Sequence, residues 1–161
     1  MHLPDGVVSA PICVGGFLGA AAATGFALRR VPERQIPQFA VLAAFYFALG
    51  AVHLPIGVLS VHLQLTGLLA VLLGWRAIVP VAVGVALQAV LLHHGGVTTL
   101  GVNILVLGLP AMAVGAVAAP RLARWTPPVA GLAAGGATVL CGLASLAMAA
   151  GLVMGSQAAL G

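Results

Sequence analysis

The sequence predicts an all-α integral membrane protein, a bundle of about six transmembrane helices. Each helix that spans a membrane requires roughly 20 apolar residues. Three observations predict this class. The chain has 161 residues, of which 62% are hydrophobic and 5% are charged, whereas a soluble domain carries about 25% charged residues. Its mean hydropathy is +1.21. Apolar runs separated by Pro, Gly and Arg recur along its length. A composition this apolar excludes both a soluble domain and a disordered chain.

Six apolar segments follow one another, and together residues 1–161 are expected to form a single membrane domain. The first segment is expected to begin at Ser9 or Ala10, with a proline in its first turn. The third is short and follows a connection that contains Gly and Pro, LPIGVLS at 54–60, while the fourth precedes the loop GGVTTLG at 95–101. We expect the six helices over residues 11–30, 37–54, 62–74, 77–93, 102–119 and 128–153.

The positive charges all fall on one side of such a bundle. If the N-terminus is outside, the three inner loops contain Arg29, Arg30 and Arg34, then Arg76, then Arg121 and Arg124. This is the positive-inside pattern of a multi-pass protein in the cell membrane. All five histidines fall at the opposite, outer ends, where the N-terminus is expected to be tucked in. Because the charges follow the first apolar run, that run is expected to be an uncleaved helix rather than a signal peptide.

Several functional classes are excluded by what the sequence lacks. Six scattered arginines form no basic patch for nucleic acid. The two acids, Asp5 and Glu33, form no pair for acid–base catalysis, and no nucleotide-binding or hydrolase motif occurs. Cys13 and Cys141 lie far apart in apolar runs and are expected to be core residues. The chain is therefore not expected to be an enzyme.

Small residues recur one helical turn apart, as in Gly15-xxx-Gly19 and Gly131-xxx-Gly135. Such spacing lets two helices approach closely. Packing within this protein's own bundle is one interpretation, and docking of a partner helix is the other.

The histidines predict a metal site, because neutral imidazole is the commonest metal ligand and nitrogen donors suit Ni, Cu, Co and Zn. The opening Met1-His2 adds a chelate: the α-amine, the amide nitrogen between the two residues and an imidazole nitrogen can close two fused rings around one metal. Three nitrogens near one plane favour Ni(II) or Cu(II), with Co(II) possible. The alternative is that the histidines lie at the membrane interface and bind nothing.

Three segments resemble the CbiM/NikM family, the substrate-capture (S) components of energy-coupling-factor cobalt and nickel transporters. They are MHLPDGVVS (1–9), SVHLQLTGLL (60–69) and HGGVTTLGVN (94–103). The resemblance implies metal ligation by the Met1 amine, by the amide and imidazole nitrogens of His2, and by the imidazole of His62. It implies Ni(II) or Co(II) as the transported substrate rather than as a cofactor.

Other polar residues match positions near that implied site. His94 and Asn103 are expected to support it, and Asp5 is a candidate to fix the tautomer of a histidine. His53 and His93 match no family position and are expected to be interfacial.

Two features depart from the family pattern. The residues before His62 lack serine-rich character and Leu63 replaces the usual proline, which leaves nickel and cobalt, and hence cobalamin synthesis or a nickel enzyme, as open alternatives. The family also usually continues past a sixth helix, so the chain is expected to be a truncated member or a short variant.

The resemblance implies partners as well: a membrane coupling (T) subunit, cytoplasmic ABC-type ATPases and a small accessory membrane protein. A stand-alone cation channel or carrier is the first alternative, although such proteins usually keep a buried carboxylate or an inverted repeat. A structural subunit of a membrane complex is the second.

Overall fold

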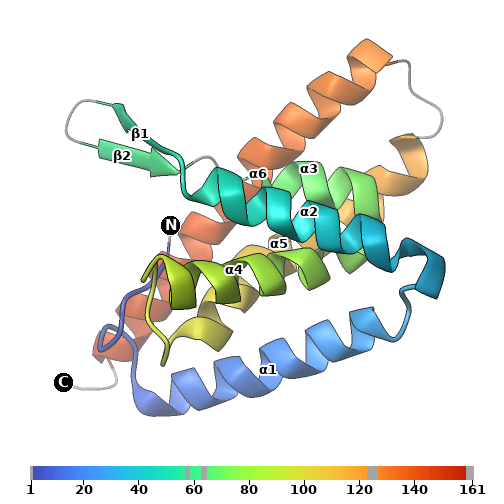
Figure 1. Ribbon diagram of the computed structural model, residues 1–161. Helices are drawn as coiled ribbons and strands as arrows, with labels where there is room; N and C mark the ends of the chain where they lie inside the picture. The colour runs from blue at the N-terminus through green and yellow to red at the C-terminus, as the bar shows by residue number, and fades with distance from the viewer. Residues whose placement is uncertain (1, 57–58, 63–64, 123–126, 159–161) are drawn as a thin grey trace.

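The computed structural model of the protein describes residues 2–56, 59–62, 65–122 and 127–158, and for 53–56, 59–62 and 122 it describes the backbone alone. Its helices are α1 (Ala10–Leu28), α2 (Ile36–Gly50), α3 (Thr66–Leu73), α4 (Ile78–Leu91), α5 (Leu100–Leu122) and α6 (Pro127–Ala158) (Figure 1). Two short 3₁₀ turns, η1 (Glu33–Gln35) and η2 (Gly74–Ala77), and a hairpin of β1 (His53–Ile56) with β2 (Leu59–His62) complete them. The predicted all-α class is confirmed, and the hairpin is an addition to it.

The hairpin corrects two predicted helix ends. The second and third segments are expected to reach residue 54 and to begin at residue 62, but α2 ends at Gly50 and α3 begins at Thr66. The strands between them pair antiparallel, with His53 opposite His62. Pro55 removes a helical hydrogen bond, and β-branched residues such as Val61 favour extended backbone. Elsewhere the segments lie where they are predicted, and α1 begins with Ser9 at its N-cap and a proline in its first turn.

Four helical stretches among the described residues are long and apolar enough to cross a membrane: Ala10–Leu28, Thr66–Leu91, Leu100–Arg121 and Pro127–Ala158. The stretch Thr66–Leu91 changes direction at Gly74. The φ of 65° at this glycine ends α3, and η2 and α4 follow it. The 15 residues of α2 span about 22 Å, less than the roughly 30 Å hydrocarbon core. The protein is therefore a multi-pass membrane protein, while six as the number of crossings stays a prediction.

The centre of the bundle is α5, which packs against α1, α3, α4 and α6, while α2 covers α4 (Figure 1). The core contains the fully buried side chains of Tyr46, Leu69, Ile78, Val81 and Val85. The contact of α5 with α3 and η2 is close because Gly115 has no side chain: a Cβ there would lie 2.7 Å from the backbone oxygen of Ala70.

The small residues fall into two groups by what they face. Gly16 and Gly19 in α1 face α5, since a Cβ on Gly16 would lie 2.9 Å from the backbone nitrogen of Val102. Gly15 and Gly131, in contrast, face away from the described bundle, because a Cβ on either would meet no described atom within 4 Å.

One face of α6 carries four of the helix's five buried described residues at intervals of four, namely Ala137, Cys141, Ser145 and Ala149. Cys141 and the second cysteine, Cys13, are both buried free thiols, as predicted.

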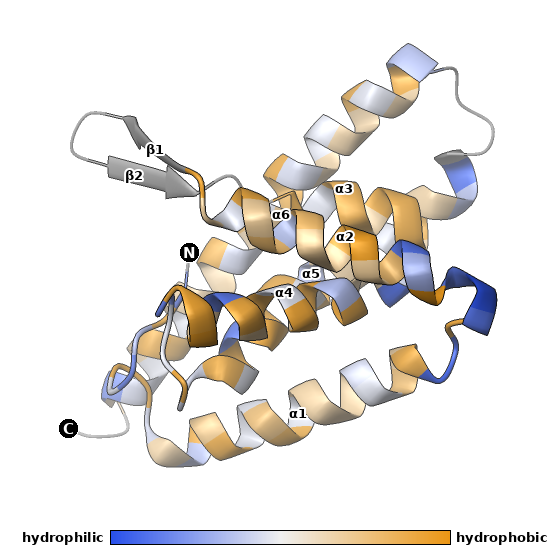
Figure 2. Ribbon diagram, viewed as in Figure 1, coloured by the Kyte–Doolittle hydropathy of each residue, from blue (hydrophilic) through white to orange (hydrophobic). Residues whose placement is uncertain are grey.

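Hydrophilic residues gather at the ends of the bundle (Figure 2), and the two ends hold different kinds. At one end the Arg76 guanidinium donates from Nη1 to the backbone oxygen of Arg30 at 3.3 Å and to Oε1 of Gln35 at 2.9 Å. The last turn of α5, with Arg121, lies at this end too, because α5 packs there against η2. His2 and the turn after α4 lie at the opposite end, with the N-terminus and the hairpin (Figure 1). Arginines and histidines are thus separated along the bundle; Arg124 lies outside the described residues.

Candidate metal centre

The N-terminal segment is held against the start of α5 by the backbone of Leu3. The Leu3 N–H donates to Oδ1 of Asn103 at 2.8 Å. Its carbonyl accepts from three donors: the N–H of Gly96 at 3.0 Å, Oγ1 of Thr99 at 2.7 Å and Nδ2 of Asn103 at 3.1 Å. Thr99 and Asn103 are buried, so these bonds are shielded from water and geometrically specific. We call these four bonds the Leu3 clamp.

The side chain of Leu3 strengthens this attachment. It is buried in a small apolar cluster with Val8, Cys13, Val102 and Ala149, which come from α1, α5, α6 and the N-terminal segment itself. Apolar burial and the Leu3 clamp therefore fix the same residue, one position after His2.

Asp5 ties the same segment to the loop before α5. Its carboxylate accepts from the backbone N–H of Thr98 at 2.8 Å, from that of Val97 at 3.3 Å and from the Thr98 hydroxyl. These bonds, led by the one from the Thr98 side chain, lower the pKa of Asp5 below its ordinary value because they favour the charged form. Gly96 makes the close approach possible, since a Cβ there would lie 2.5 Å from the backbone nitrogen of Asp5.

The turn after α4 brings His2 and His94 to the same end of the bundle. His93, with φ of 53°, and Gly95, with φ of 83°, reverse the chain there. A Cβ on Gly95 would lie 2.9 Å from Cβ of His2 and 3.0 Å from Nδ2 of Asn103. His2 therefore packs directly on Gly95, next to His94 in the chain. The structure thus assigns His93, expected only to be interfacial, a part in ending α4.

Gln88 connects this turn to α2, and sequence analysis missed it. Its backbone carbonyl accepts from the N–H groups of Leu92 and His94, both at 3.1 Å. Its side chain is fully buried and donates from Nε2 to the backbone oxygen of Tyr46 at 3.4 Å. A Cβ on Gly50 would lie 2.8 Å from its Cδ. One residue thus contacts both the turn with His94 and the end of the helix that leads into the hairpin. The available signal was a lone amide in an apolar segment, which is costly in a membrane unless it has a structural or functional role.

The expected ligands are described to different extents. His2 is described in full and is half-buried. Met1 lies outside the described residues, and the side chain of His62 does too, although its backbone is paired with that of His53. Within the part of the chain that the structure describes, no three His, Cys, Asp or Glu side chains are grouped closely enough to hold a metal. The ligand set therefore stays a prediction, while Asp5, His94 and Asn103 all belong to the end of the bundle where it would lie.

Comparison with known protein families decides the wider identity. The family described as the cobalt uptake substrate-specific transmembrane region (CbiM) matches residues 2–160. This chain belongs to the CbiM family. The resemblance predicted from the three motifs is therefore confirmed, and the chain is a membrane protein of the cobalt and nickel transport family.

Individual CbiM relatives agree with this assignment. A putative metal transport protein of Haemophilus influenzae is 38% identical over 112 residues, which are 70% of this chain and 54% of the relative. The fused nickel transport protein NikMN of Rhodobacter capsulatus is 33% identical over 65% of this chain and 32% of its own length. Cobalt transport protein CbiM 2 of Pelobacter propionicus is 37% identical over 65% of this chain and 50% of its own. The chain spans about half the length, or less, of these relatives.

Solved structures support the fold. A transition metal transporter and a truncated form of such a transporter each superpose with a TM-score of 0.71, at 23% and 22% identity. The matched regions cover 90% of this chain and 68% and 72% of the solved chains. The likeness establishes that the helical bundle is shared.

Proposed function

We propose that this chain is the substrate-capture component of an energy-coupling-factor transporter and binds Ni(II) or Co(II) for import. The metal ligands in this proposal are the α-amine of Met1, the amide and imidazole nitrogens of His2, and the imidazole of His62. Two fused chelate rings and a fourth nitrogen make a planar site, which Ni(II) favours and Co(II) can accept. The metal is the substrate, and no reaction takes place on it.

The Leu3 clamp is the observation that carries this proposal. A chelate built from a chain terminus requires that the terminus be fixed, since a freely moving one would lose conformational entropy on binding. Four hydrogen bonds and a buried side chain fix residue 3. The attachment lies directly after His2, which is where a chelate of residues 1 and 2 needs the backbone to be held.

Asn103, Asp5 and His94 act in this proposal as supporting residues. Asn103 holds the backbone after His2, Asp5 holds the loop at residues 97–98, and His94 stands next to the glycine on which His2 packs. Their role is to fix the chelating atoms before metal arrives, which raises affinity by reducing the entropy lost on binding.

The proposal includes partners and an orientation in the membrane. We propose that a membrane coupling subunit, ABC-type ATPases and a small accessory membrane protein drive uptake, because the matched chain offers no nucleotide-binding motif of its own. Names of relatives such as the putative fused cobalt transport protein CbiMQ support a membrane partner. The separation of arginines from histidines supports an N-terminus on the outer face. Accessibility of a cysteine at Val97 from outside and at Glu33 from inside would test that orientation, and labelling of both from one side would contradict it.

A metal titration of the purified protein tests the proposed function. We expect one Ni(II) or Co(II) per chain, with the visible absorption spectrum of a planar nitrogen site for Ni(II). A structural subunit with incidental histidines would bind neither metal specifically. Uptake by cells that carry the whole transporter should require ATP hydrolysis, whereas uptake that continues without it would indicate a stand-alone channel or carrier.

A further inference from the structure

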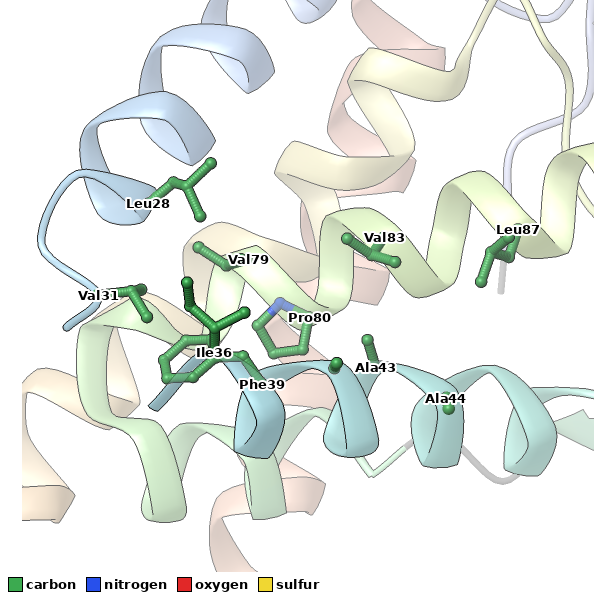
Figure 3. A pocket seen from close by; sticks show the side chains of 11 residues that line it. Leu28, Val31, Ile36, Phe39, Ala43, Ala44, Val79, Pro80, Val83 and Leu87 are labelled. Atoms are coloured by element: carbon green, nitrogen blue, oxygen red, sulfur yellow. The ribbon is translucent and has the colours of Figure 1, made fainter. Parts of the chain in front are cut away.

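An apolar groove runs along the outside of the bundle between α2 and α4, beginning at the end of α1. It has a volume of about 300 Å³, and Figure 3 shows its lining. Leu28, Ile36 and Phe39 lie at one end of the groove, and Val83, Ala44 and Leu87 continue it along the two helices. The groove exists because α2 presents alanines, among them Ala43 and Ala44, to the larger side chains of α4.

The length of the groove matches one leaflet of a membrane. Its lining extends along α2 from Ile36 to Ala44 and along α4 from Val79 to Leu87. Eight helical residues advance about 12 Å, and half of the hydrocarbon core is about 15 Å. The groove therefore runs from the interface toward the middle of the bilayer.

Arginines border the residues at the interfacial end of the groove in the sequence, and the Arg76 guanidinium contacts one of them in space. Arg29 and Arg30 directly follow Leu28, and Arg34 lies two residues before Ile36. The Arg76 guanidinium lies 5.8 Å from the ring centroid of Phe39, itself part of the lining. These four cations and one acid, Glu33, carry a net charge of +3.

The dimensions indicate what the groove can hold. Over a length of about 12 Å, the groove volume of about 300 Å³ corresponds to a mean width of only about 5 Å, so a helix about 10 Å across would lie on the groove rather than in it. A single extended hydrocarbon chain is far thinner and meets only the apolar side chains that line the groove. At its end, a guanidinium group matches the oxygens of a phosphate, with which it can form two parallel hydrogen bonds.

We propose that the groove binds one acyl chain of an anionic phospholipid from the leaflet on the arginine side, with its phosphate held by Arg76 and the neighbouring arginines. The net charge of this end selects an anionic headgroup over a zwitterionic one. The site lies at the end of the bundle opposite the N-terminus and stands whether or not the chain binds a metal.

Native mass spectrometry of the purified full chain tests this site. The probes are phosphatidylglycerol and phosphatidylcholine with identical acyl chains, added at equal concentration. We expect one phosphatidylglycerol to be retained preferentially. Ala44→Phe fills the groove and should abolish this retention, whereas Leu143→Phe, on an exposed part of α6, should leave it unchanged. Equal retention of both lipids, or retention by Ala44→Phe, would overturn the proposal.

Two variants of Arg76 separate charge from folding. Arg76→Gln removes one cation near the membrane surface and should weaken phosphatidylglycerol retention about fivefold, while Arg76→Lys keeps the charge and should stay within about twofold of the parent. An equal loss in both would assign Arg76 a purely structural role and refute headgroup binding. If Ala44→Phe prevented copurification of a membrane partner while lipid retention persisted, the groove would be a protein-docking surface instead.

Discussion

Replacing Asn103 with alanine should release the N-terminal segment and weaken metal binding. The substitution removes the acceptor of the Leu3 N–H and one of three donors to the Leu3 carbonyl. A buried N–H without a partner costs about 1–3 kcal/mol, and the lost second bond about 0.5–1.5 kcal/mol. The sum, about 1.5–4.5 kcal/mol, shifts the docking equilibrium of the segment by roughly tenfold to two-thousandfold. Affinity falls only as far as the fraction of chains with a docked segment falls. Because the segment is mostly docked in the parent, that fraction changes less than the equilibrium constant, and we expect a loss of about 10- to 100-fold in Ni(II) affinity.

Graded variants make this prediction specific. Thr99→Val removes one donor to the Leu3 carbonyl, which keeps two others, so a loss of about two- to tenfold is expected. Thr24→Val is the matched control: its hydroxyl lies in α1, and in the described residues it is buried with no hydrogen-bond partner. Its affinity should equal that of the parent.

Two measurements decide the outcome for Asn103. Calorimetric titration gives the affinities, and amide hydrogen exchange reports whether residues 3 and 96 are released. Faster exchange without any loss of affinity in Asn103→Ala would refute the claim that the Leu3 clamp serves metal binding. Slow exchange retained at residue 3 would refute the calculated cost itself.

Three further predictions concern the residues around the Leu3 clamp. His62→Ala should lose far more metal affinity in a titration than His93→Ala, and His94→Ala should lose an intermediate amount, about 10- to 100-fold; equal affinity in His62→Ala and the parent would exclude His62 as a ligand. His93→Gly should raise the thermal midpoint, because φ of 53° costs a residue with a Cβ about 1 kcal/mol, and a lowered midpoint would contradict the part assigned to this residue in ending α4. The Asp5 carboxylate is stabilised in the folded chain, so its pKa is lowered; its contribution should be fully present above pH 3.8, the ordinary pKa, and be lost as pH falls below it. Hydrogen exchange at residues 97 and 98 should therefore accelerate in acid for the parent but not for Asp5→Asn, and identical acid profiles would contradict this.

Most of the helical architecture could be predicted because membrane spans depend on composition over long windows. The apolar runs around α1, α5 and α6 are long, uninterrupted by charge and marked by residues with clear local preferences, such as the proline after Ser9. The separation of arginines from histidines along the bundle follows from the same alternation of helices. These features depend on local sequence, which is why one sequence suffices for them.

The hairpin and Gln88 show where local sequence is insufficient. Residues 53–56 and 59–62 are apolar enough to extend either neighbouring helix, and only their antiparallel pairing, with His53 opposite His62, makes them strands. Gln88 looks like a single polar interruption, and its importance arises from contacts with Tyr46 and Gly50, some 40 residues away.

The contacts of the N-terminal segment were predicted only in part for the same reason. The motifs singled out Asp5, His94 and Asn103, but the hydrogen bonds that Asn103 makes to Leu3 join positions 100 residues apart. Such contacts depend on how α5 is placed against the N-terminal segment, which no window along the chain contains.

The most direct test of the central claim is to add one alanine before Met1. This extension keeps every side chain and the Leu3 clamp, but it moves the free amine away from His2 and turns the former amine into a peptide nitrogen. The control adds the same residue after Gly161. We predict that binding of Ni(II) and Co(II), measured by titration, collapses in the N-terminal variant alone, while its thermal midpoint without metal and the hydrogen exchange at residue 3 match the parent. Retained affinity in the extended protein would contradict the chelate of Met1 and His2, and with it the account of metal capture given above.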